Sequence, residues 1–89
     1  MIFSECIVFL NQEIFMFDEL STHKTKAIRF NSIEVAATKI EAIINREVNG
    51  AAKHEMKTPV GNSGNMYEIL SENDNVKIVT TIVLVELLN

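Results

Sequence analysis

The chain has 89 residues, of which 47% are hydrophobic and 22% charged, with a formal net charge of −4 at pH 7. This length accommodates one small domain, and the hydrophobic content excludes a disordered chain. The acidic balance disfavours general nucleic-acid binding. A single cysteine, Cys6, allows no internal disulfide. We therefore expect a reducing, cytoplasmic location, which would be the host cytoplasm if the protein were viral.

No apolar stretch reaches the roughly 20 residues that span a bilayer as a helix. The longest covers residues 76–88 and is interrupted by polar residues, including Lys77 and Glu86. The first residues show neither the basic region nor the small-residue cleavage site of a signal peptide. The sequence therefore predicts neither a membrane segment nor a secretory signal.

Residues 2–17 are predicted to be extended, because two β-prone runs, 7–10 and 14–17, follow each other. One long bent strand and a hairpin that turns at Asn11 and Gln12 are both compatible with this pattern. The hairpin is disfavoured, because a two-residue turn usually needs Asn-Gly or a similar pair. The polar stretch 18–25 predicts a loop, and residues 26–30 predict a short strand.

The clearest element is a helix over about residues 32–48. Asn31 is expected to be its N-cap, with Glu34 completing a capping box and Phe30 and Val35 forming a hydrophobic staple. Gly50 is expected to end the helix in the left-handed conformation. The apolar positions of one helix face are Ile33, Ala36, Ala37, Ile40, Ile43, Ile44 and Val48.

A flexible loop is predicted over about residues 51–65, with a short strand near 53–57, because this stretch holds the only proline and two of the three glycines. Residues 66–70 and 76–88 are predicted strands, joined as an antiparallel hairpin by the turn-forming residues 71–75. The expected fold is a single α+β domain covering residues 1–89. In this fold a small antiparallel sheet packs on one amphipathic helix.

Both faces of the predicted strands are mainly apolar, although one helix can cover only one face of a sheet. Along residues 76–88, for example, Ile78 and Ile82 alternate with Val79 and Val83. Leaving three or four such side chains in water costs several kcal/mol, comparable with the stability of a small domain. We therefore expect a homo-oligomer, at least a dimer, to complete the fold. The alternative is that the N-terminal hairpin folds over the open face.

Basic residues concentrate in two segments, 23–29 and 53–57, which hold five of the eight Lys and Arg residues. Together with the glycine-rich residues 61–64, these segments predict a site between subunits for a small anionic, nucleotide-like ligand. Ordinary solvated loop charges would give the same pattern, and the glycine-rich stretch is not a P-loop. The candidate ligand-binding residues are Lys24, Lys26, Arg29, Lys53, His54, Lys57, Asn62 and Ser63.

Catalytic and metal-binding patterns are not evident. His23 and His54 are the only histidines, and neither has a nucleophile at a suitable spacing, since Cys6 lies in an apolar strand. Glu72 and Asp74 lack the spacing of a calcium loop. We expect no enzyme, metal or cofactor, but a small homo-oligomeric protein that binds or sequesters such a ligand. The alternative is a protein-binding inhibitor or regulator, such as a phage-encoded counter-defence protein, that uses an apolar strand edge or face.

Overall fold

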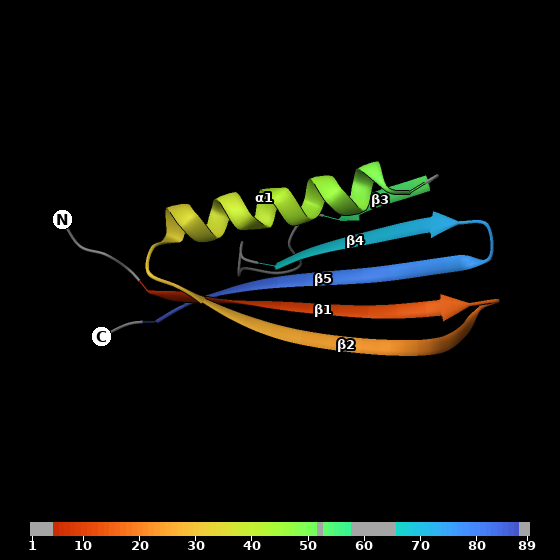
Figure 1. Cartoon of the computed structure of the whole chain (residues 1–89), viewed down its shortest axis with the longest axis horizontal. Helices are drawn as coiled ribbons and strands as arrows, with labels where there is room; N and C mark the ends of the chain where they lie inside the picture. The colour runs from red at the N-terminus through yellow and green to blue at the C-terminus, as the bar shows by residue number, and fades with distance from the viewer. Residues whose placement is uncertain (1–4, 52, 58–65, 88–89) are drawn as a thin grey trace.

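The computed structural model describes residues 5–51, 53–57 and 66–87. The fold is α+β: a five-stranded antiparallel sheet carries one helix along one face (Figure 1). The described residues contain no helix that is long and apolar enough to cross a membrane. The elements in chain order are β1 (Cys6–Met16), β2 (Glu19–Phe30), α1 (Ile33–Asn49), β3 (Lys53–Lys57), β4 (Met66–Asn73) and β5 (Val76–Glu86).

The strand order in the sheet is β2-β1-β5-β4-β3, and every neighbouring pair is antiparallel. β1 and β5 pair along their full lengths, from Cys6 opposite Glu86 to Met16 opposite Val76. These two strands form the middle of the sheet together with β4, whereas β2 and β3 are its edges. The long strands give the molecule an elongated shape, 49 Å in its longest dimension.

The N-terminal region is a long hairpin whose turn lies outside the expected positions. Asn11 and Gln12 pair with Thr25 and Lys24 in the middle of β1 and β2, so the disfavoured hairpin at these residues is wrong and the single long strand is confirmed over Cys6–Met16. The turn is at residues 17–18 instead. The predicted loop over 18–25 is also wrong, because these residues belong mostly to β2. An edge strand with exposed side chains tolerates the polar composition that suggested a loop.

The helix begins one residue later than expected. Ser32 is the N-cap, with extended backbone angles (φ −147°, ψ 151°), and its Oγ accepts a hydrogen bond from the Val35 amide at 3.2 Å. The predicted capping box of Asn31 and Glu34 is therefore wrong. The predicted staple between Phe30 and Val35 is wrong as well, because a cap at Ser32 moves the staple positions and Val35 is 57% exposed.

The helix ends at Gly50 without the expected left-handed residue. Gly50 has φ −84° and ψ −3°, in the right-handed region, and its amide donates to the Arg46 carbonyl at 3.1 Å. A Cβ at this position would lie 3.2 Å from the same oxygen. Glycine therefore serves here for close approach to the preceding turn, not for a positive φ.

The C-terminal hairpin is confirmed, with a shorter turn than predicted. β4 continues to Asn73, so that only Asp74 and Asn75 form the turn, and Asp74 takes a positive φ of 48°. The short strand expected near residues 53–57 is confirmed as β3, which pairs with β4. Part of the predicted loop is thus a strand. Residue 52 and residues 58–65 of that loop lie outside the described residues.

The core lies between α1 and one face of the sheet. We call this face the helix side; it carries the even-numbered residues of β1 and β5 and the odd-numbered residues of β4. Every buried residue of β1, β4 and β5 lies on this side. The buried residues are Cys6, Val8, Ala36, Ile40, Ile43, Ile69, Ser71, Thr80 and Ile82.

The opposite face, here called the open face, carries the odd-numbered residues of β1, β5 and the 23–29 part of β2, and the even-numbered residues of β4. None of these residues is buried. The N-terminal hairpin extends the sheet sideways (Figure 1), so the alternative in which it folds over this face is wrong. Within the described parts of the chain, α1 is the only helix, and it packs on the other side.

Candidate functional site

The predicted ligand residues do not come together in one chain. Three of them lie on β2 and three on β3, at opposite edges of the sheet. Four strand spacings separate these edges, about 19 Å in all. The β2 residues are Lys24, Lys26 and Arg29; the β3 residues are Lys53, His54 and Lys57. The last two candidates, Asn62 and Ser63, lie outside the described residues.

The basic residues of β2 are themselves divided between the two faces. Lys24 and Lys26 pair with Gln12 and Leu10 and therefore lie on the helix side. Arg29 lies on the open face, where its guanidinium forms an ion pair with Glu5. The alternation of side chains along a strand separates residues that are close in sequence. One small anion therefore cannot contact all three side chains.

A shallow groove lies on the helix side of the first hairpin, lined by Leu10, Gln12, Lys24, Thr25 and Lys26. Both lysines are exposed. A lysine can cover apolar surface with its aliphatic stem and keep its ammonium group in water. The groove thus combines an apolar floor with two cationic groups, a pairing that suits an anionic partner with an apolar part.

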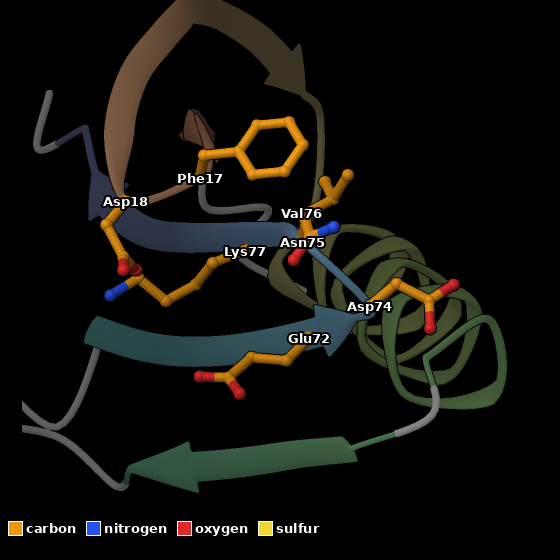
Figure 2. Close-up of a pocket in the computed structure, with 7 residues that line it drawn as sticks. All are labelled: Phe17, Asp18, Glu72, Asp74, Asn75, Val76 and Lys77. Atoms are coloured by element: carbon orange, nitrogen blue, oxygen red, sulfur yellow. The ribbon is translucent and has the colours of Figure 1, made fainter.

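A second pocket lies at the end of the sheet where both two-residue turns meet (Figure 2). The Phe17 amide donates to the Asn75 carbonyl at 2.9 Å and so joins the two turns. In Figure 2 the side chains of Asp18, Glu72 and Lys77 extend to the same side, whereas Asp74 extends away from them. The residues that line the pocket are Phe17, Asp18, Glu72, Asp74, Asn75, Val76 and Lys77.

The chemistry of this pocket is mixed in charge. Carboxylates outnumber the one amine, and the Lys77 amine also lies 5.3 Å from the centre of the Phe15 ring, within cation–π range. No group of three or more His, Cys, Asp or Glu residues in the described ranges is placed to hold a metal ion. Sequence reasoning missed the pocket, because it expected a loop over residues 18–25 in place of the tight turn at residues 17–18, and it gave no sign that two distant turns would touch.

His23 belongs to an exposed hydrogen-bonded trio on the open face. Its Nε2 lies 2.5 Å from Asn11 Oδ1, which also accepts from Thr25 Oγ1 at 3.0 Å. The Thr25 hydroxyl lies 3.4 Å from the same ring nitrogen. Sequence spacing did not reveal this trio, because β1–β2 pairing brings Asn11 to residues more than ten positions away. The trio fixes the histidine ring, but it is open to solvent and has no neighbouring cysteine.

Cys6 lies on the helix side and is fully buried. Its Sγ lies 3.8 Å from the Ser32 carbonyl, so the thiol contacts the start of the helix. Burial raises the pKa of the thiol above its usual 9.0, and the Glu86 carboxylate raises it further. The thiol is therefore protonated at neutral pH and sealed from solvent, the opposite of what a nucleophilic cysteine requires.

The largest feature without a covering element is the open face. Phe9 and Val85 are each 39% exposed there, and their neighbours Ile7 and Val83 are half-buried. The register places these four side chains together, because Ile7 pairs with Val85 and Phe9 with Val83. They form the apolar end of the open face, whereas the His23 trio and Glu13 make its middle more polar.

The chain matches no protein-family model, and searches of curated proteins and of solved structures give no match. The open face and the groove beside Lys24 and Lys26 are the two surfaces best suited to binding.

Proposed function

We propose that the protein is a small non-catalytic binding protein that assembles as a homodimer through the open face of its sheet. The observation that carries this proposal is the contrast between the two faces. The helix side holds all the buried residues of β1, β4 and β5, and the open face holds none, although Ile7, Phe9, Val83 and Val85 lie on it. An antiparallel sheet with one solvated face normally carries polar side chains there.

The open face is large enough for a stable dimer. Its two longest central strands have 11 residues each. At about 3.3 Å per residue and 4.8 Å per strand, the face measures roughly 36 by 24 Å, or roughly 700 Å² after allowance for the shorter strands. Standard interfaces bury about 800 Å² per partner. A second copy of this chain therefore matches the face in both size and apolar character.

Dimer symmetry also bears on the predicted anionic ligand. A two-fold axis parallel to the central strand β5 would place β2 of one copy opposite β3 of its partner, because these strands are at opposite ends of the order. The register places β3 level with residues 20–25 of β2, so His23, which is on the inward face, would lie opposite the basic segment of the partner's β3, whereas Arg29 would lie four residues farther along the strand. A small anion between β2 and β3 would pair with these basic groups. We propose this position for a nucleotide-like ligand.

The assembly is tested by light scattering on the purified chain. The expected mass is twice the chain mass of 10.0 kDa. The substitution Phe9→Lys places a charge in the centre of the apolar end and should give a monomer. Val35→Lys is the matched control, because Val35 is 57% exposed on the outer side of α1. A monomeric parent chain, or equal effects of the two substitutions, would contradict the proposed dimer.

The ligand is tested separately, by thermal unfolding against a panel of nucleotides and by mass spectrometry of anything that co-purifies. A nucleotide bound between the subunits should raise the unfolding temperature of the parent chain, and His23→Ala should reduce that rise. Lys39→Ala, on the exposed helix surface, is the control. A dimer without any nucleotide-dependent stabilisation would retain the assembly and rule out the ligand.

A further inference from the structure

The outer edge of β2 is a long unpaired strand edge. β2 has 12 residues, pairs with β1 on one side, and is the last strand of the sheet on the other. All its residues except Ile28 and Phe30 are exposed. Such an edge presents a row of backbone N–H and C=O groups that another extended segment can pair with. This edge is perpendicular to the open face, so it stays accessible in the proposed dimer.

The charge of this edge is opposite to that of the rest of the chain. β2 contains three of the Lys and Arg residues and one acidic residue, Glu19, which gives it a charge of +2. The net charge of the whole chain is −4, so the residues outside β2 together carry a charge of −6. Lys24 and Lys26 are two positions apart, so both lie on the helix side of the strand. A partner strand would meet a local positive field that the protein's net charge conceals.

A second copy of β2 is a poor occupant of this edge. In a two-fold antiparallel pair centred on Thr25, Lys24 of one copy would lie opposite Lys26 of the other, and Lys26 opposite Lys24, all on the same face of the sheet. Like charges opposite each other across two strands are destabilising. The edge therefore favours a strand of opposite charge.

We propose that an extended acidic segment of another protein adds to the outer edge of β2 as a further strand. Its recognition element would be two acidic residues separated by one position, which places both carboxylates on the side that carries Lys24 and Lys26. Backbone pairing supplies the strand geometry and the lysines select the sequence.

In the test, a synthetic peptide in which glutamate alternates with valine is titrated into the full chain, and binding is monitored by NMR. The peptide should shift and protect the backbone amides of β2. Lys26→Glu and Lys24→Glu should each weaken binding about tenfold, as reversal of a cross-strand charge pair requires. Lys39→Glu makes the same charge change on the exposed surface of α1 and should alter binding by less than about twofold.

Two further peptides separate strand addition from simple charge attraction. A version with N-methylated backbone amides keeps its charge but cannot pair as a strand, and should not bind. A version with lysine in place of glutamate should not bind either. The proposal would be overturned if the N-methylated peptide bound as tightly as the unmodified one, or if Lys39→Glu weakened binding as much as Lys26→Glu. It would also be overturned if ATP, added in place of the peptide, shifted the β2 amides as strongly. Absence of binding by any of the peptides at a concentration of about 1 mM would overturn it as well, since the lysines would then serve only to prevent strand pairing at this edge.

Discussion

The side-chain amide of Gln12 in β1 lies 3.1 Å from the carboxylate of Glu47 near the end of α1. The same amide nitrogen donates to Thr80 Oγ1 at 3.1 Å. Thr80 is fully buried, and the Glu47 side chain is only 15% exposed. Gln12 therefore satisfies two polar groups under the helix and ties the last helical turns to the two central strands.

Gln12→Leu is expected to destabilise the protein. The substitution keeps an apolar volume under the helix but leaves the Glu47 carboxylate and the Thr80 hydroxyl without this donor. The free energy of unfolding should fall by about 1–3 kcal/mol, measured by urea denaturation. Asn45→Leu is the matched control, since Asn45 is exposed on α1. A similar loss in both variants would show that the hydrogen bonds contribute nothing specific.

The N-cap can be tested by two neighbouring substitutions. Ser32→Ala removes the hydroxyl that accepts from the Val35 amide, and should lower the free energy of unfolding by about 1 kcal/mol. Asn31→Ala should change it by only a few tenths, because Asn31 is exposed and lies outside the helix. Chemical denaturation of both variants measures the difference. A larger loss in Asn31→Ala would move the helix start back to the position that the sequence suggested.

Phe17→Gly is expected to stabilise the protein. Phe17 has φ 52°, in the left-handed region, and its side chain is 70% exposed. A non-glycine residue in that region costs about 1–2 kcal/mol, and little buried surface offsets it here. The loss of chain entropy on folding a glycine reduces the net gain to about 0.5–1 kcal/mol. Thermal unfolding should show a higher midpoint.

Leu20→Gly is the control for this turn substitution. Leu20 is 57% exposed but lies in β2 with strand geometry, so glycine should lower the stability there by about 0.5–1 kcal/mol. Opposite signs at the two positions would confirm that the backbone conformation decides the effect. If Phe17→Gly were as destabilising as Leu20→Gly, the exposed ring would be making contacts worth more than the strain.

Periodicity in the sequence identified the elements that bury apolar side chains. The helix and the C-terminal hairpin were predicted because their apolar residues recur at helical and strand spacings, and the core then uses Ile40, Ile43, Ile69 and Ile82 from them. β2 was not predicted as a full strand, because an edge strand with exposed side chains shows no such pattern. Its pairing with β1 joins residues as far apart in sequence as Cys6 and Phe30, and local composition does not encode such a pairing.

The candidate site could be predicted only as a set of residue types. Composition located the basic residues, but their positions depend on strand order and register. The order puts β2 and β3 at opposite edges, and the alternation of side chains sends Lys26 and Arg29 to different faces. The helix cap shows the same limit on a smaller scale: Asn31 and Ser32 are both good capping residues, and only the backbone angles choose between them.

The buried thiol of Cys6 makes stability fall at alkaline pH. Burial and the Glu86 carboxylate raise the pKa of this thiol in the folded chain above the 9.0 of an unperturbed cysteine. Below that pH the thiol is protonated in both states and its titration has no effect. Above it, the unfolded chain releases the proton while the folded chain retains it, which favours unfolding.

Cys6→Ala isolates this effect from the other groups that titrate at high pH. The difference in unfolding free energy between the parent chain and the variant should be constant at neutral pH. As the pH rises past 9.0, the parent should lose stability relative to the variant, by up to about 1.4 kcal/mol per pH unit. Urea denaturation at a series of pH values measures this difference. If it stayed constant up to about pH 10, the thiol would titrate alike in both states, and the folded chain would not shield it.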